Sequence, residues 1–377
     1  MMTRAFTTRS LVLPALLALV APLSAQTQTE SLDRPARSAL ALEPVQGAWS
    51  VTEQRDAAAL WDAMRKEDPA NTEAQYNYFK ATRNARMAAN NGDLPPATEA
   101  ELKQVSDETE RYAPGSFEGC MMRYQLAFPS RQAFTELGKA YQKEPDRMEL
   151  ISPMLGRAML DGDKADVLRW SRALRTRGEQ APGLTDVAVD MLQSVDANGV
   201  VFTNGDMDTH PAVAVQQVDG YRQDVLVVDQ RLLADAGYRQ RVWSEASASG
   251  QPPGPGPEYA RSLSTSSPRP VYLALSIDPS WTMALRGQLY PTGLAFRLSA
   301  RPLDTTPLLE QRWALLRKPA NAGPLSRNYL LPGSLLLEHY RASGDEAGAA
   351  RTELELRRFS DRIGATQDLY KAGILKH

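Results

Sequence analysis

The sequence predicts an α+α/β fold, in which helical hairpins flank a small, mostly parallel sheet. Apolar residues recur at helical spacing from about Trp49 to Ser194 and again near the C-terminus. Between these regions, short apolar runs of strand length alternate with a helix-like segment. The change of period predicts a helical domain at 49–195, an α/β domain at 196–305 and a C-terminal helical segment at 306–377.

The N-terminus has the pattern of a secretory signal peptide. Two arginines precede an apolar run, which is too short and too rich in proline for a membrane span, and small residues follow it. Residues 1–25 are therefore predicted to be the signal peptide, cleaved after Ala25, and residues 26–48 a flexible leader. We expect a periplasmic or secreted protein with no transmembrane segment after cleavage.

Composition excludes several classes of function. The net charge is −2 and no basic block occurs, which argues against nucleic acid or an anionic membrane as the partner. The only cysteine is Cys120, so the chain has no intramolecular disulfide and no cysteine-based metal site. Apolar neighbours at helical spacing indicate that Cys120 is a buried structural thiol.

Proline and Gly-Asp pairs divide the helical regions into hairpins. Pro69, Pro145 and Gly162 each end a segment with one apolar face, and Gly344 does the same near the C-terminus. Helix pairs punctuated in this way resemble tetratricopeptide repeats, but no regular 34-residue period is present. The hairpins are therefore described as TPR-like.

The central domain begins with a strand–helix–strand unit. Residues 199–203 and 224–230 are strand-like, and Thr209–Val218 between them is helix-like, as expected for a Rossmann-like βαβ unit. Residues 269–277 and 293–300 add two later strands, which gives a sheet of roughly four. The stretch from 246 to 268 is rich in Gly, Pro and Ser and is predicted to be loop or disordered.

The block VVFTNGDMDTHPAVAVQQVDGYRQDVLVVDQRLL, from residue 200 to 233, resembles a family of uncharacterised exported bacterial proteins with an FTNGDxDTxP signature. It is also similar to the soluble C-terminal region of protein O-mannosyltransferase-like membrane proteins. The segments NYFKATR and PTGLAFRL resemble other parts of this family, and Met207 and His210 depart from its usual residues. The resemblance implies a fold and an exported location, but no biochemical role.

The turn after the first strand is the candidate site, because open α/β sheets bind ligands where parallel strands end and helices begin. Asp206 and Asp208 are candidate metal ligands for a divalent cation, and His210 is the candidate catalytic acid or base. The structural alternative is that Asp208 or Thr209 caps the helix and Asp206 holds turn amides. The predicted ligand-binding residues are Asn204, Gly205, Asp206, Asp208, Thr209 and Arg222.

The leading hypothesis is a non-enzymatic binding or scaffold protein for protein or glycan in the cell envelope, with no cofactor. The alternative is a metal-assisted enzyme that acts on glycans or phosphorylated sugars through Asp206, Asp208 and His210. A third hypothesis is an envelope assembly subunit, in which the sheet is purely structural and the helical arrays expose a large apolar patch.

Overall fold

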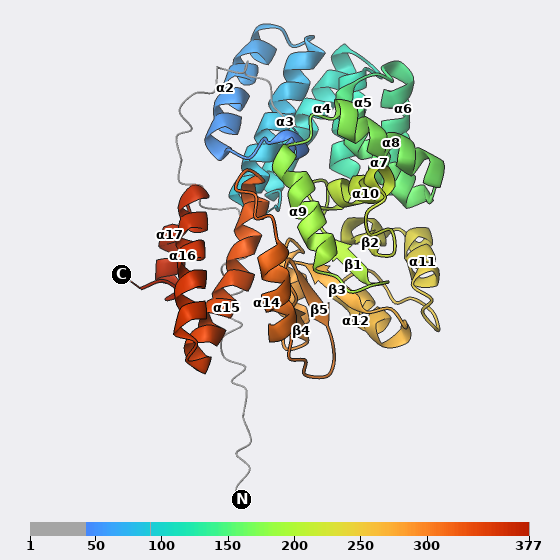
Figure 1. Cartoon of the computed structure of the whole chain (residues 1–377). Helices are drawn as coiled ribbons and strands as arrows, with labels where there is room; N and C mark the ends of the chain where they lie inside the picture. The colour runs from blue at the N-terminus through green and yellow to red at the C-terminus, as the bar shows by residue number, and fades with distance from the viewer. Residues whose placement is uncertain (1–42, 91, 377) are drawn as a thin grey trace, which may run out of the picture.

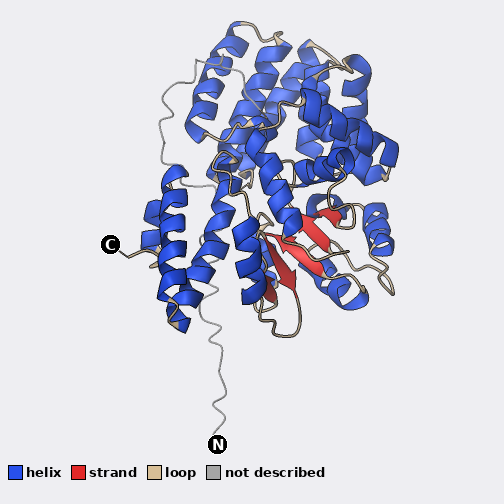
Figure 2. Cartoon of the chain, in the orientation of Figure 1, coloured by secondary structure: helices blue, strands red, loops and turns tan. Residues whose placement is uncertain are grey.

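The computed structural model describes residues 43–90 and 92–376. The predicted signal peptide, and the leader up to residue 42, lie outside this part. Within it the chain forms sixteen α-helices and one five-stranded sheet, which confirms the α+α/β fold class (Figures 1 and 2). Among these helices, none combines the length and the hydropathy that crossing a membrane requires.

Helices precede the sheet and pack largely as antiparallel neighbours in sequence. The closest pairs are α2 with α3, α5 with α6 and α7 with α8. Local signals fix their ends: Ser50, Asn71 and Asp163 cap helix N-termini, and Gly162 ends α7 in the left-handed conformation. The elements are α2 (Val51–Glu67), α3 (Thr72–Ala89), α4 (Pro96–Tyr112), α5 (Phe117–Ala127), α6 (Arg131–Lys143), η2 (Met148–Leu150), α7 (Ile151–Asp161), α8 (Lys164–Arg177) and α9 (Pro182–Gln193).

The sheet has the strand order β2-β1-β3-β5-β4. The central strand β1 (Val200–Thr203) pairs in parallel with β2 (Leu226–Asp229) and with β3 (Val271–Ala274). The predicted βαβ unit is therefore confirmed, with α10 (Thr209–Asp219) as its helix. Each residue of β1 is buried, as expected for a strand covered on both faces.

The far side of the sheet differs from the prediction of four strands. A fifth strand, β4 (Leu289–Pro291), pairs antiparallel with β5 (Ala295–Leu298), and β5 runs antiparallel to β3. Four strands thus point the same way and β5 opposes them, so the sheet is mixed. Three residues ending in proline carry too little periodicity to be recognised, and only the pairing with β5 makes them a strand.

The stretch from 246 to 268 is only partly loop. Its second half forms α12 (Pro257–Ser266), so the loop prediction is wrong there. Pro257 occupies the first turn, where proline is tolerated, and Tyr259, Ala260 and Leu263 are buried on one face. This face is decided by packing against the sheet, which composition cannot show.

The remaining helices cover the sheet and extend to the C-terminus. Buried side chains from all three predicted regions, including Phe79, Phe202 and Phe359, belong to one connected core. The predicted domain boundaries and the relation to tetratricopeptide repeats stay predictions. These elements are η3 (Gln230–Ala234), α11 (Ala236–Glu245), α13 (Pro279–Ala284), α14 (Thr306–Leu315), η4 (Gly323–Tyr329), α15 (Leu330–Ser343), α16 (Glu346–Arg362) and α17 (Thr366–Lys371).

Candidate functional site

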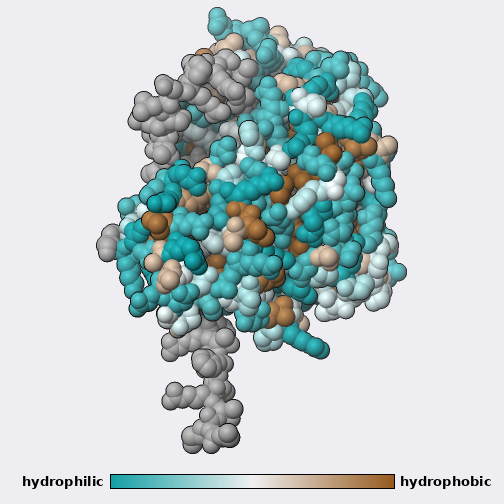
Figure 3. All heavy atoms as spheres, in the orientation of Figure 1, coloured by the Kyte–Doolittle hydropathy of each residue, from teal (hydrophilic) through white to brown (hydrophobic). Residues whose placement is uncertain are grey.

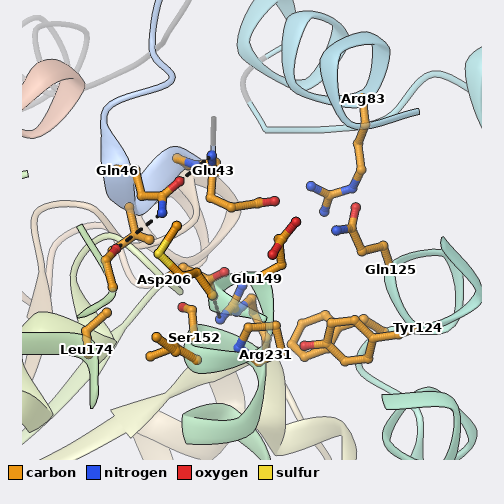
Figure 4. Close-up of a pocket in the computed structure, with 17 residues that line it drawn as sticks. Glu43, Gln46, Arg83, Tyr124, Gln125, Glu149, Ser152, Leu174, Asp206 and Arg231 are labelled. Carbon is orange, nitrogen blue, oxygen red and sulfur yellow. Dashed lines mark hydrogen bonds and ion pairs between the residues drawn. The ribbon is translucent and has the colours of Figure 1, made fainter. Parts of the chain in front are cut away.

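A small cavity lies where the sheet meets the helical hairpins. Because β1 and β2 are parallel, the turn after β1 and the start of η3 come to the same edge of the sheet. Side chains from α3, α5, η2 and α7 complete the wall, and the cavity has a volume of about 80 Å³ (Figure 4). Much of its polar lining comes from Glu43, Arg83, Tyr124, Glu149, Ser152, Asp206 and Arg231.

Asp208 holds the turn together from inside. Its carboxylate is buried and accepts hydrogen bonds from the amides of Asn204 (2.9 Å) and Thr209 (2.6 Å) and from the hydroxyl of Ser276. Burial raises the pKa of Asp208, and the hydrogen bonds from Ser276 and Asn204 oppose this. Asp208 is the N-cap of α10, as the structural alternative expected.

The start of α10 does not offer free amides. The Thr209 amide donates to Asp208 and to the Gly205 carbonyl (2.8 Å), and Pro211 has no N–H. Thr209, His210, Pro211 and the next residue are buried. The start of α10 therefore presents no exposed amide to a ligand, and a ligand at this edge would have to meet side chains instead.

Asp206 points out of the turn and lines the cavity. One oxygen accepts a hydrogen bond from Arg231 (2.7 Å), which also bridges to Asp229 at the end of β2 (2.8 Å). Burial raises the pKa of Asp206, but the charge and the hydrogen bond of Arg231 outweigh it, and the pKa is lowered to about 2. Asp206 is therefore a carboxylate at neutral pH.

Gly205 allows Arg231 to approach this closely. Its φ of +110° is a conformation that side chains rarely adopt, and a Cβ there would lie 2.8 Å from the Arg231 guanidinium. The neighbouring Asn204 is tied to the sheet edge, because its side chain donates to the Ser276 carbonyl (3.1 Å) and accepts from Gln230 (2.6 Å). The turn is thus fixed on both sides of Asp206.

His210 is buried beneath the cavity. Its Nδ1 lies 2.6 Å from the Ser152 hydroxyl and 3.9 Å from an Asp206 oxygen. Its Nε2 is buried without a hydrogen-bond partner and faces Gly156 of α7. Burial lowers the pKa of His210, so the imidazole is neutral near pH 7.

The helices contribute two donors to the cavity. Arg83 of α3 is half-buried, and Figure 4 shows its guanidinium directed from the helix toward Gln125 and the cavity. Within residues 43–90 and 92–376, Arg83 has no ion-pair partner and no side-chain hydrogen bond. Tyr124 of α5 is buried with its hydroxyl turned toward the cavity in the same view.

The end of the predicted leader closes one side of the cavity. Residues Glu43–Trp49 include the short helix η1 (Pro44–Gln46), whose Val45 is buried. The Val45 carbonyl accepts from the Ala181 amide (3.0 Å), and the Gln46 side chain donates to the Gly178 carbonyl (3.3 Å). Residues 43–48 are therefore packed against the start of α9.

Five of the six predicted ligand-binding residues come together at this edge, and their roles stay predictions. Arg222 does not join them. Its guanidinium lies at the opposite end of the strands, where it donates to the carbonyls of Leu192 (2.7 Å) and Asp196 (3.0 Å) and pairs with Asp224. It precedes β2 and so cannot reach the end of that strand.

No cluster of three or more His, Cys, Asp or Glu side chains in the described part of the chain is arranged to hold a metal ion. Asp206 and Asp208 point to different surroundings, and the oxygens of Asp208 already accept hydrogen bonds. A shared cation at these two residues stays a prediction.

Sequence reasoning missed Arg83, Tyr124, Ser152 and Arg231. Arg231 had a usable signal, because it follows β2 by two residues and parallel neighbours end at one edge. Arg83 lies in the NYFKATR segment, whose only signal is its resemblance to part of a family. Nothing in the sequence places the other two beside this turn.

A family model described as TMEM260-associated domain 2 matches residues 184–253. The match contains β1, α10 and β2, and so includes Asp206 and Arg231 but not Arg83 or Tyr124. No curated protein and no solved structure matches the chain. The chain is thus similar to this domain over the βαβ unit, and the broader resemblance to exported bacterial proteins stays a prediction.

Proposed function

We propose that the protein is an exported, non-enzymatic binding protein of the cell envelope, which holds one sugar group of a glycan in the cavity beside Asp206. The observation that carries this proposal is a small polar cavity whose charged walls come from distant parts of the chain. Five separate segments supply Glu43, Arg83, Glu149, Asp206 and Arg231. Polar groups that converge on one pocket are a usual feature of ligand-binding sites.

The chemistry of the lining suits a sugar. Each sugar hydroxyl both donates and accepts, so carboxylates and guanidinium groups together can satisfy several of them. The rings of Tyr124 and Phe128 give the wall an apolar part. At roughly 10–15 Å³ for one ordered water, the cavity holds on the order of six waters, which suits one terminal group and not a polymer.

The geometry of His210 supports binding rather than nucleophilic catalysis. A catalytic triad uses both ring nitrogens, one for the nucleophile and one for the orienting carboxylate. Here Ser152 and Asp206 both approach Nδ1, while Nε2 is enclosed against α7. Ser152 and His210 are therefore better suited to shaping the floor of the cavity.

The assembly hypothesis has less support. On the face shown in Figure 3, apolar residues form small spots separated by polar ones. The large exposed apolar side chains are scattered over different elements: Leu60, Met64, Tyr112, Met148, Val218, Met283, Leu315 and Leu354. A docking surface for assembly would need a contiguous patch of several hundred Å².

Calorimetry of the purified exported chain against a panel of envelope monosaccharides and short glycans tests the proposal. We expect binding by the unaltered chain, and loss of binding in Asp206→Ala because the ion pair that positions Arg231 is broken. Asp56→Ala, which removes an exposed carboxylate on α2, is the matched control and should bind normally. Absence of heat with every sugar would refute the proposal.

The metal-assisted enzyme is the second candidate, favoured by one observation: Asp206 lines the cavity within 3.9 Å of His210 Nδ1. This candidate expects Mn²⁺, Mg²⁺ or Ca²⁺ to bind, with the heat abolished in both Asp206→Ala and Asp208→Ala. If no cation gives heat with the unaltered, correctly folded chain, this candidate is removed.

A further inference from the structure

We propose that the bound group is anionic, a carboxylate or phosphate on a sugar, and that Arg83 is the residue that binds it. This inference rests on the proposed function, because it concerns the same cavity. It goes beyond that function by naming the chemical class of the ligand and a recognition residue outside the matched βαβ unit.

The pairing of charges around the cavity carries the argument. Asp206 pairs with Arg231 (2.7 Å), Glu149 with Arg147 (2.8 Å) and Glu43 with Lys80 (3.5 Å). Each of these charges is compensated inside the protein. Among the described residues that line the cavity, Arg83 is the charged side chain without such a partner.

An unpaired guanidinium is costly in this position. Removing a charge from water is unfavourable unless an opposite charge or hydrogen bonds replace the lost hydration. Burial lowers the pKa of Arg83, and the charges of Glu43 and Asp206 only partly oppose this. A ligand anion would supply the missing compensation.

The geometry of arginine selects the kind of anion. A guanidinium presents its N–H groups as a planar fork, which matches two oxygens of one carboxylate or phosphate. The Tyr124 hydroxyl, with no hydrogen bond to the described part of the protein, adds a second donor on the same wall (Figure 4). Two donors without partners therefore face the space that the anion would occupy.

The opposite wall argues that the anion belongs to a larger polar molecule. Glu43 Oε1 is buried and accepts no hydrogen bond, although Lys80 is 3.5 Å away. The Glu43 side chain lines the cavity and is 24% exposed, so its carboxylate can accept from a ligand hydroxyl. An acidic sugar carries both features, an anion for Arg83 and a hydroxyl for Glu43.

The test compares methyl glucuronide, methyl glucoside and inorganic phosphate by calorimetry with the unaltered full chain, in low salt. The glucuronide and the glucoside differ mainly by the carboxylate. Because charge-assisted hydrogen bonds are the strong ones, we expect the glucuronide to bind at least about tenfold more tightly. Arg83→Gln should remove that advantage, and Arg83→Lys should keep part of it.

Arg86→Gln is the matched control, because Arg86 is an exposed arginine on the same helix. It should leave the preference intact, and circular dichroism confirms that each variant is folded. If Arg83→Gln fails to fold, the comparison of glucuronide with glucoside on the unaltered chain still tests the anionic ligand, and Arg83→Lys tests the role of Arg83.

The outcomes separate this inference from the proposed function. Equal affinity for glucuronide and glucoside would overturn the inference and leave glycan binding standing. If phosphate binds in a way that depends on Arg83 and neither sugar binds, the anion site is supported and the proposal of glycan binding is refuted. Binding of none of the three probes, or an anion preference unchanged in a folded Arg83→Gln, would overturn the inference.

Discussion

Arginines gather at both ends of the parallel strands, and the two ends use them differently. At the amino ends, Arg222 and Arg269 donate to backbone carbonyls around the starts of β1 and β2. At the carboxyl ends, Arg231 bridges Asp206 and Asp229, and Arg83 faces the cavity without an ion-pair partner in the described chain.

This difference distinguishes structural arginines from recognition arginines. A guanidinium whose N–H groups are consumed by carbonyls fixes the loops that supply them and has little capacity for a ligand. One that meets a cavity with its donors unused has that capacity. The type of residue is the same at both ends, so only its surroundings decide its role.

The largest effect on stability is expected from a substitution at the amino ends of the parallel strands. Arg222→Met removes hydrogen bonds to the carbonyls of Leu192, Val195 and Asp196 as well as the pair with Asp224. Urea denaturation should show a loss of about 3 kcal/mol in the free energy of unfolding, with glycan affinity unchanged. The exposed Arg172→Met is the control and should change stability by less than about 0.5 kcal/mol.

If Arg222→Met keeps its stability and loses ligand affinity, the distinction between structural and recognition arginines is contradicted. Arg222 would then belong to a binding surface, as the sequence alone suggested.

The next largest effects distinguish the roles of the two aspartates in the turn after β1. Asp208→Ala should lower the free energy of unfolding by about 2 kcal/mol, because it removes the cap of α10 and leaves the Asn204 amide without its acceptor. Compared with Asp208→Ala, Asp206→Ala should lower the free energy of unfolding less and weaken glycan binding more, because Asp206 faces the cavity. Urea denaturation and calorimetry on the same two variants check this, and a reversed pattern would contradict it.

His210 should make stability depend on pH. Its folded pKa lies below the ordinary 6.5, because burial outweighs the nearby Asp206 carboxylate. As the pH falls through 6.5, the unfolded chain takes up the proton first, so stability falls until the folded pKa is reached. Because one proton is involved, the slope cannot exceed about 1.4 kcal/mol per pH unit.

Urea denaturation at pH 7.5, 6.5 and 5.5 measures this slope. His210→Gln should flatten it, whereas His339→Gln, on the exposed surface of α15, should not. A slope that survives in His210→Gln would assign it to other groups.

The smallest effect concerns the Tyr124 hydroxyl. Tyr124→Phe should weaken ligand binding roughly fivefold, about one hydrogen bond, and should barely change stability because the hydroxyl has no partner in the described part of the protein. Tyr112→Phe, at an exposed position, is the control. A loss of stability without a loss of affinity would show that the hydroxyl serves the fold.

Local patterns explain which predictions succeeded. The strand from Val200, the helix from Thr209 and the helix end at Gly162 are fixed by neighbouring residues, and the structure has all three. The Asp208 cap belongs to the same class. The rule that parallel strands end at one edge also pointed to Arg231 and away from Arg222, although the prediction did not apply it.

By itself, the sequence determined the βαβ unit, the turn that follows its first strand and the helical hairpins, because each depends on residues only a few positions apart. Only the tertiary structure decided that Asp208 is buried, that Arg222 lies at the opposite end, and that Arg83, Tyr124 and Ser152 meet Asp206. These residues are separated by tens of positions in the chain. Their meeting follows from how buried faces pack into one core, and spacing along the sequence does not encode that directly.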